Sequence, residues 1–209
     1  MGASLSQNVK CFFIAWSVVT AIIIAAWFTL VLLNSPCDVP ALQPNFDLSK
    51  YAGTWYELKR NTDLPFEKGE CVTARYTAQT DGSIEVKNSQ YLVADKKVDR
   101  IIGKAWPSKL RLGALEVIFY AEFGANYRVV STDYDNYAIV YSCSTWFGGS
   151  LSLFKYAWVL VRTPIQSGTA AYNSVMATVT PIMERELPTF NAKAWLRTTD
   201  QGGSCVYDN

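Results

Sequence analysis

The residues best suited to chemistry in this chain are its cysteines, at positions 11, 37, 71, 143 and 205. A redox-active or catalytic thiol pair normally lies close in sequence, and these residues are widely spaced. In an oxidising compartment the last four would pair as structural disulfides, for which the sequence allows three connectivities. The spacing therefore favours structural bridges over catalytic thiols.

Histidine is absent from all 209 residues. This excludes imidazole acid–base catalysis, a Ser-His-Asp triad and histidine metal sites. The sequence also has no phosphate-binding loop, no dinucleotide-binding glycine pattern and no Cys-x-x-Cys. Gly148-Gly149-Ser150 is better explained as a hairpin turn than as a nucleophile elbow, because no base accompanies it. We therefore expect a protein without catalytic residues, metal or cofactor.

Charge and composition limit the possible partners. The net charge is +1 and only 18% of residues are charged, so no basic surface for nucleic acid is expected. Aromatic residues reach 14%, which suits both barrel interiors and membrane interfaces. The composition thus points away from nucleic acid and toward apolar partners.

An apolar segment opens the chain. Residues 11–33 carry no formal charge, and 23 residues are enough for a helix to span a bilayer with some tilt. A cleaved signal peptide is the alternative, but the exit, Leu32 to Cys37, is a poor cleavage site with Pro36 where a mature chain would begin. We expect an uncleaved transmembrane signal-anchor helix over 11–33.

The flanking charges predict the orientation of this segment. Lys10 precedes it and Asp38 is the first charge after it, so residues 1–10 are expected in the cytosol. The globular part would then lie on an oxidising, non-cytosolic side, which could be extracellular, lumenal or in an intermembrane space. Gly2 fits a myristoylation pattern, for which a chance match is the alternative. Cys11 could be palmitoylated, and the alternative is an ordinary thiol within the apolar segment. Residues 34–44 form a Pro-rich linker that reaches at most about 40 Å, before a domain over 45–209.

Short β-rich runs separated by turn signals follow the linker. Asp81-Gly82 predicts a hairpin between the second run and the third. A helical pattern then covers 169–186, where Pro181 is expected to break or kink the helix. Strands are expected near 54–60, 71–78, 83–92, 97–105, 114–121, 126–132, 137–145 and 152–162. The order predicts an all-β, eight-stranded up-and-down antiparallel barrel with one flanking C-terminal helix, with a β-sandwich as the generic competitor.

Three motifs carry a family resemblance. The run 45–60, with Gly53-Thr54-Trp55, resembles the opening motif of the lipocalins, and 132–143 and 157–164 resemble their second and third motifs. Residues 66–76 are similar to the second strand of the apolipoprotein D, bilin-binding and bacterial lipocalin group. The resemblance covers about 37–205 and implies an eight-stranded barrel that holds a small apolar ligand. The apolar N-terminal segment departs from the family, whose members are usually secreted or lipid-anchored.

The same resemblance implies roles for particular residues. It pairs Cys37 with Cys143 and Cys71 with Cys205 as structural bridges. It also places the guanidinium of Arg162 across the indole of Trp55, which would close one end of the barrel by a cation–π contact. We expect this pair to be structural, against a reading of Arg162 as a counter-ion for ligand.

Period-two alternation sorts each strand into an inner and an outer face. The inner faces are apolar with a few polar tips and hold no carboxylate, while 157, 159 and 161 form an apolar outer face that a helix must cover. The family's ligand contacts match Tyr76, Asn88 and Trp158. The full set expected to bind ligand is Tyr76, Asn88, Val117, Phe119, Tyr156 and Trp158. The alternative is a barrel filled by its own side chains.

Three classes of function are compatible with a chain of this kind. The first is a membrane-anchored lipocalin that binds a small lipophilic ligand, such as a lipid, sterol, fatty acid or pigment. The second is a non-catalytic accessory subunit of a larger membrane complex, with the barrel as an interaction module. The third, an enzyme such as an isomerase, is disfavoured because the inner faces lack a carboxylate and Cys71 is expected to be bridged.

Overall fold

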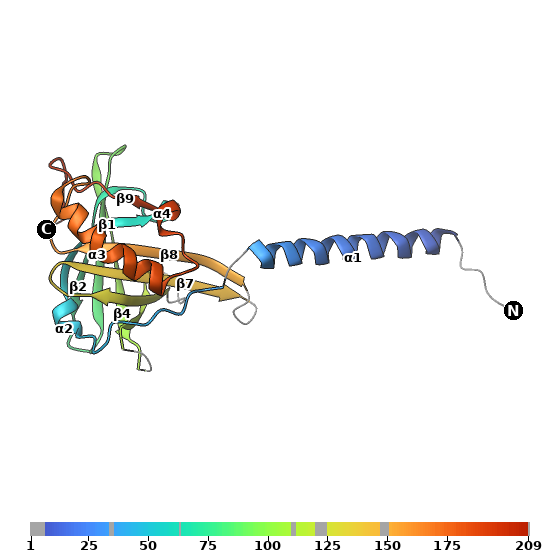
Figure 1. The fold of residues 1–209 in the computed structure, drawn as a ribbon, viewed down its shortest axis with the longest axis horizontal. Coiled ribbons are helices and arrows are strands. Elements are labelled where there is room, and N and C mark those ends of the chain that lie inside the picture. Colours follow the sequence, from blue (N-terminus) through green and yellow to red (C-terminus); the bar gives the residue numbers. More distant parts are fainter. Residues whose placement is uncertain are drawn as a thin grey trace.

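The computed structural model describes residues 7–33, 36–62, 64–109, 112–119, 125–146 and 151–208 (Figure 1). The strands are β1 (Gly53–Asn61), β2 (Glu70–Ala78), β3 (Ile84–Leu92), β4 (Lys97–Pro107), β5 (Ala114–Ile118), β6 (Ala125–Thr132), β7 (Tyr137–Trp146), β8 (Leu151–Val161) and β9 (Leu196–Thr198). The helices are α1 (Gln7–Leu33), α2 (Leu48–Tyr51), α3 (Ala170–Glu186) and α4 (Ala192–Trp195).

Strands β1 to β8 close into an antiparallel barrel. Each strand pairs with the next along the chain, and β1 returns to pair with β8. Residues 53–56 of β1 pair with β2, while 56–60 pair with β8, so β1 closes the ring. The predicted up-and-down barrel is confirmed, and the β-sandwich is excluded.

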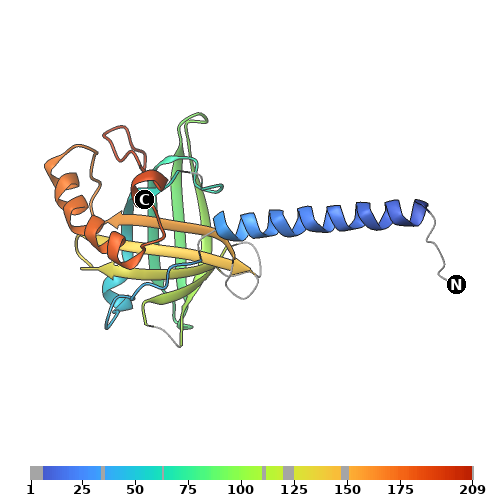
Figure 2. The same ribbon diagram turned by 45° about the vertical axis from the view of Figure 1, so that its right-hand side comes forward.

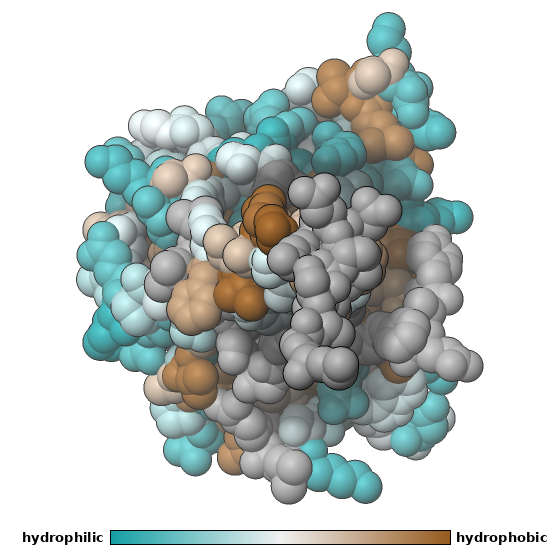
Figure 3. All heavy atoms as spheres, turned by 90° about the vertical axis from the view of Figure 1, so that its right-hand side faces the viewer, coloured by the Kyte–Doolittle hydropathy of each residue, from teal (hydrophilic) through white to brown (hydrophobic). Residues whose placement is uncertain are grey.

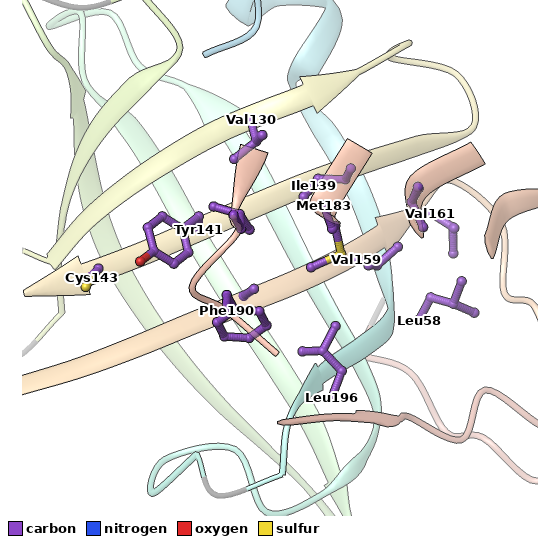
Figure 4. Close-up of a cluster of buried hydrophobic side chains, with 13 residues drawn as sticks. Leu58, Val130, Ile139, Tyr141, Cys143, Val159, Val161, Met183, Phe190 and Leu196 are labelled. Atoms are coloured by element: carbon purple, nitrogen blue, oxygen red, sulfur yellow. The ribbon is translucent and has the colours of Figure 1, made fainter. Parts of the chain in front are cut away.

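Two apolar clusters form on the two sides of the barrel wall, because apolar side chains occupy both faces of β7 and β8. The inner cluster fills the base of the barrel around Trp55 and Tyr76. The outer cluster lies between the wall and α3, where Val179 and Met183 are buried with Val159 (Figure 4). The helix therefore covers the apolar outer face that the alternation of β8 requires.

Helix α3 begins at Thr169, whose side chain accepts a hydrogen bond from the backbone N–H of Tyr172. The expected break at Pro181 does not occur, since the helix continues to Glu186. Pro181 is exposed, so the carbonyl that loses its N–H partner can be hydrated, and burial of Val179 and Met183 on either side holds the helix together.

The largest difference between an expected and an observed strand limit is at β5, which ends at Ile118 rather than at 121. Residues 120 and 121 lie outside the described ranges. Three short elements, α2, α4 and β9, were not predicted. Each is at most four residues long and too short to show a hydrophobic period. Strand β9 forms only because it can pair with the edge of β1 at 59–61.

We call the two ends of the barrel the base and the mouth. The base holds α2, the β2–β3 turn at 79–83 and the β6–β7 turn at 133–136. The mouth holds the β1–β2 loop at 62–69 and the β3–β4 turn at 93–96. Strand β7 runs from the base at Tyr137 to the mouth at Trp146.

The chain before the barrel forms an arm along its outside. Cys37 is bridged to Cys143 of β7, and Gln43 donates its backbone N–H to the carbonyl of Val129 at 2.9 Å. The arm reaches the base where the N–H of Asp47 donates to the hydroxyl of Tyr134 at 2.9 Å. Residues 36–47 are thus packed on the barrel rather than extended from it.

Both disulfides that the family resemblance implies are present. Cys37–Cys143 and Cys71–Cys205 link residues 106 and 134 positions apart. The second bridge ties the C-terminal tail to β2, and the N–H of Cys71 donates to the carbonyl of Asp200 at 2.8 Å.

Helix α1 stands apart from the barrel (Figures 1 and 2). Its window Phe12–Thr29 has a mean hydropathy of 2.1 and is not buried against the rest of the chain, and its length and composition would allow it to cross a membrane. A signal sequence has the same properties. Gly2 lies outside the described residues, as does the side chain of Cys11.

Candidate functional site

A largely apolar cavity of about 110 Å³ lies inside the barrel. It is lined by side chains of several strands, among them Val86, Val117, Val140 and Leu160. An adjoining hollow of about 420 Å³ at the mouth shares Phe66, Asn88 and Phe119 with it. The inner cavity alone holds only a small group, so a longer ligand would extend into the hollow.

The base of the cavity is closed by aromatic side chains. Trp55 is fully buried and donates its indole N–H to the carbonyl of Tyr51 at 2.8 Å. The hydroxyl of Tyr127 is 2.7 Å from that of Tyr51 and 2.8 Å from that of Tyr76. Burial raises the pKa of all three tyrosines above the ordinary value, so they remain neutral donors and acceptors.

Arg162 seals the same end from outside. Its guanidinium carbon lies 3.7 Å from the ring centroid of Trp55, and it donates to the carbonyls of Tyr134, Thr54, Lys50 and Tyr51 at 2.7–3.2 Å. The N–H groups of the guanidinium are thus hydrogen-bonded to backbone carbonyls. Arg162 thus has the geometry of a structural residue rather than of a ligand's counter-ion.

Five of the six residues expected to bind ligand line the cavity: Tyr76, Asn88, Val117, Phe119 and Trp158. The sixth, Tyr156, is not in the lining and packs instead against Phe154 and Trp158, at ring distances of 4.8 and 6.1 Å.

The position of Phe119 depends on a glycine in the neighbouring strand. A Cβ at Gly103 of β4 would come within 2.6 Å of the ring of Phe119 and 2.5 Å of the carbonyl oxygen of Ile118. A glycine at 103 therefore lets the ring lie against the wall.

Two carboxylates reach the cavity, so the expectation of inner faces without a carboxylate was wrong. Glu57 of β1 and Glu67 of the β1–β2 loop both line it. Glu57 follows Trp55 by two positions and faces inward by plain alternation, so the first strand itself carried this signal. The bulge between Glu57 and Lys59 then turns Arg60 to the same side as Glu57. Glu67 was missed because it lies on a loop, where no periodicity applies.

Glu57 is neutralised within the barrel wall. Arg60 donates to its Oε1 at 2.5 Å, and both side chains are only 2% exposed. The hydroxyl of Thr199 donates to the same oxygen, and Arg60 also donates to the carbonyl of Gly69 at 2.6 Å. This buried pair is satisfied by protein groups and ties the C-terminal tail to the mouth loop.

Within the part of the chain that the structure describes, Glu67 has no cationic side chain paired with it, in contrast to Glu57. Its Oε2 accepts a hydrogen bond from the indole N–H of Trp158 at 3.0 Å. Burial, and next the negative charge of Glu57, raise the pKa of Glu67 to about 8. Trp158 was expected to bind ligand, and in the structure its indole N–H is already donated to Glu67.

Asn88 presents an unsatisfied polar atom to the cavity. Within the described ranges its Oδ1 is the buried side-chain polar atom without a hydrogen-bond partner. A buried acceptor without a hydrogen bond lowers the stability of the fold, and a hydrogen-bond donor on a ligand could pair with it.

The described residues do not form a metal-binding cluster. Among the residues that the structure describes, no group of three or more Cys, Asp or Glu side chains is placed to hold a metal ion. The cavity's chemistry is therefore that of an apolar container with a few polar contacts.

Comparisons with known proteins agree with this geometry. Residues 46–181 match the family model of the lipocalin-like domain. The chain is 40% identical to bovine apolipoprotein D over 132 residues, which cover 61% of this chain and 67% of that protein. It is 34% identical to the outer membrane lipoprotein Blc of Citrobacter freundii over 149 residues, 68% of this chain and 77% of that one.

Solved structures support the same fold. Insecticyanin from the tobacco hornworm Manduca sexta superimposes with a TM-score of 0.63 at 21% identity, covering 81% of this chain and 92% of insecticyanin. Lobster apocrustacyanin A1 gives a TM-score of 0.61 at 20% identity, covering 81% and 93%. With the closed barrel, the flanking helix and the enclosed cavity, these matches show that the chain belongs to the lipocalin family, in the group of apolipoprotein D and bacterial Blc.

Proposed function

We propose that this protein is a membrane-anchored, non-catalytic lipocalin that binds a small lipophilic ligand in its barrel. The observation that carries the proposal is the apolar cavity inside the barrel, to which the buried Oδ1 of Asn88 offers an unsatisfied acceptor. Burial of hydrocarbon in such a cavity favours binding, and a ligand hydroxyl or amide would pair with Asn88. Sterols, pigments and lipids with a hydroxyl or amide fit this description, as do fatty acids in their protonated form.

The two carboxyls support binding rather than catalysis. Glu57 is held by Arg60 and Thr199, and Glu67 by Trp158, so each has a structural partner. Neither has a partner arrangement that would activate a nucleophile or a water molecule.

Mass spectrometry of lipids extracted from natively purified full chain tests the ligand. We expect about one small lipophilic molecule per barrel. Val117→Trp, which fills the cavity, should lower this occupancy at least several-fold. Thr77→Trp, on the exposed outer face of β2, should leave occupancy unchanged. A wild-type barrel that is empty after native extraction would contradict the proposal.

The anchor is the second part of the proposal. Helix α1 has the length and hydropathy of a membrane span, and the two disulfides favour a barrel on the oxidising side. Intact-mass measurement of membrane-extracted protein should find residues 1–33 retained, and alkaline carbonate should not release the chain. A mass that begins after residue 33 would show instead that the segment is a cleaved signal.

An accessory subunit of a larger membrane complex remains the second candidate. Ile102 and Trp106 expose 54% and 42% of their surface on the outer face of β4, where a partner could cover them. An empty barrel that co-purifies in a stable complex, with Ile102→Lys disrupting that complex, would favour this function.

A further inference from the structure

The mouth of the barrel and the attachment of α1 lie at the same end of the molecule. Cys37 is bridged to Cys143, which lies three residues before the mouth end of β7 at Trp146. Figure 2 shows α1 leaving the molecule beside the ends of β7 and β8. Because the bridge is a covalent bond, it holds Cys37 at this end of the barrel whatever the angle between α1 and the barrel.

The tether between the helix and the bridge is short. Cys37 follows Leu33, the last residue of α1, by four positions, so the two are at most about 14 Å apart. The base lies farther from this point, since Cys143 follows Tyr137 by six positions of β7, roughly 20 Å along the strand. The arm first reaches the base at Gln43, whose Oε1 accepts a hydrogen bond from the N–H of Thr132, six positions after Cys37. A membrane that holds α1 is therefore closer to the mouth than to the base.

The mouth carries side chains that suit a bilayer surface. Phe66 on the β1–β2 loop and Val93 on the β3–β4 turn are 57% and 60% exposed. Exposed lysines lie beside them: Lys68 on the loop, Lys96 on the turn and Lys97 at the start of β4, where Lys97 pairs with Asp95 at 3.6 Å. Apolar tips flanked by lysines match the hydrocarbon boundary and the phosphates of lipid headgroups.

Figure 3 views the molecule from the side on which α1 leaves it, with this helix pointing toward the viewer and hydrophilic residues around the periphery. The hollow at the mouth, lined by Phe66, Glu67 and Arg100, connects this surface to the cavity inside the barrel. The route from the outside to the cavity thus opens where the tether holds the domain.

We propose that the mouth rests on the bilayer that α1 spans, and that ligand passes directly between that bilayer and the cavity. The inference rests on the proposed membrane anchor and on ligand binding. Direct transfer removes the step in which a lipid's hydrocarbon is exposed to water, so the barrier to exchange falls. The protein would then sample lipids of its own membrane rather than lipids dissolved in the surrounding fluid.

Fluorophore quenching tests the orientation without requiring ligand. Full chain with Cys11→Ser is placed in phosphatidylcholine vesicles that contain doxyl-labelled phosphatidylcholine. A fluorophore is attached at Lys68→Cys or Val93→Cys at the mouth, or at Leu112→Cys, an exposed apolar control beyond the base end of β4. We expect quenching at the two mouth positions to exceed that at Leu112 several-fold. Equal quenching at the two ends, or stronger quenching at Leu112, overturns the proposal.

The second measurement concerns transfer. A dansyl-labelled fatty acid in the vesicle is followed by energy transfer from tryptophan as it enters the barrel. The double variant Lys68→Asp, Val93→Asp should slow transfer several-fold, while Thr80→Asp, Leu112→Asp at the base should not. Equal rates in all variants overturn direct exchange. If no variant takes up the probe, ligand binding fails on its own, and the quenching result still decides the orientation.

Discussion

At the scale of single residues, the polar groups of the cavity divide into those satisfied by the protein and those left for ligand. Glu57, Trp158 and Tyr76 already have partners within the wall. Asn88 retains a free acceptor, and Glu67 has an elevated pKa. Selectivity should therefore depend on Asn88 and Glu67 more than on the aromatic side chains.

Glu67 should make stability depend on pH in a window where few other groups titrate. Its folded pKa of about 8 lies above the ordinary value of 4.5, so the folded state keeps a proton that the unfolded state releases. The free energy of unfolding should therefore fall as pH rises from 5 to 8, by at most about 1.4 kcal/mol per pH unit for one proton. The chain has no histidine to obscure this slope.

Glu67→Gln should flatten this dependence, since the amide cannot ionise. Urea unfolding in detergent at several pH values would measure the slope. Glu116→Gln, an exposed carboxyl on β5, is the matched control and should retain the wild-type slope. A slope that persists in Glu67→Gln would assign the titration to another group.

Arg162→Lys should lower the free energy of unfolding by about 2 kcal/mol. A lysine keeps the charge but loses the planar stack on Trp55 and most of the four hydrogen bonds to carbonyls. Chemical denaturation monitored by near-ultraviolet circular dichroism would report the change. Arg75→Lys, on an exposed position of β2, should have little effect; an unchanged midpoint for Arg162→Lys would mean that the base is closed without it.

At the scale of elements, the barrel wall is stabilised from both sides. The inner cluster is built by the β-strands together with Tyr51 of α2, whereas the outer cluster requires α3. The two clusters share the wall but not their side chains, so damage to one should leave the other assembled.

Met183→Ala tests this separation. Met183 is 2% exposed beneath α3, and its truncation should cost about 2–5 kcal/mol of stability. Ligand occupancy, measured on the folded protein, should remain at the wild-type level because the inner cavity is untouched. Glu184→Ala, on the exposed side of the same helix, is the control. Loss of ligand together with retained folding in Met183→Ala would show that the two sides of the wall are coupled.

At the scale of the whole molecule, two bridges connect distant parts of the chain. Cys37–Cys143 joins the arm beneath α1 to the wall, and Cys71–Cys205 joins the C-terminal tail to β2. Each encloses more than 100 residues, so its main effect is to restrict the unfolded chain. The first bridge also determines which end of the barrel follows the helix.

Cys37→Ser with Cys143→Ser should lower the free energy of unfolding by about 4–5 kcal/mol in the chain-entropy description. Unfolding of the full chain in detergent, with Cys71–Cys205 kept oxidised, would measure this. Cys11→Ser leaves both bridges intact and should match the wild type. A loss below about 1 kcal/mol would mean that the arm's hydrogen bonds, such as Gln43 to Val129, already hold the chain in place.

The amino-acid sequence determined by itself what local patterns encode. Alternation and turn residues predicted the eight strands, and helical spacing predicted α3, because each pattern extends over several successive residues. The family motifs supplied the disulfide pairs and the position of Arg162 on Trp55. Five of the six expected lining residues follow from strand alternation together with the family's ligand contacts.

Only the tertiary structure decided the features that depend on breaks in those patterns. A bulge turned Arg60 toward Glu57, a loop brought Glu67 to Trp158, and pairing with β1 created β9. The size of the cavity and the free acceptor on Asn88 emerged only once all strands were in place. The end of the barrel to which α1 is attached is also known only from the tertiary structure. It depends on where the bridge between Cys37 and Cys143, 106 positions apart, lies on the closed barrel.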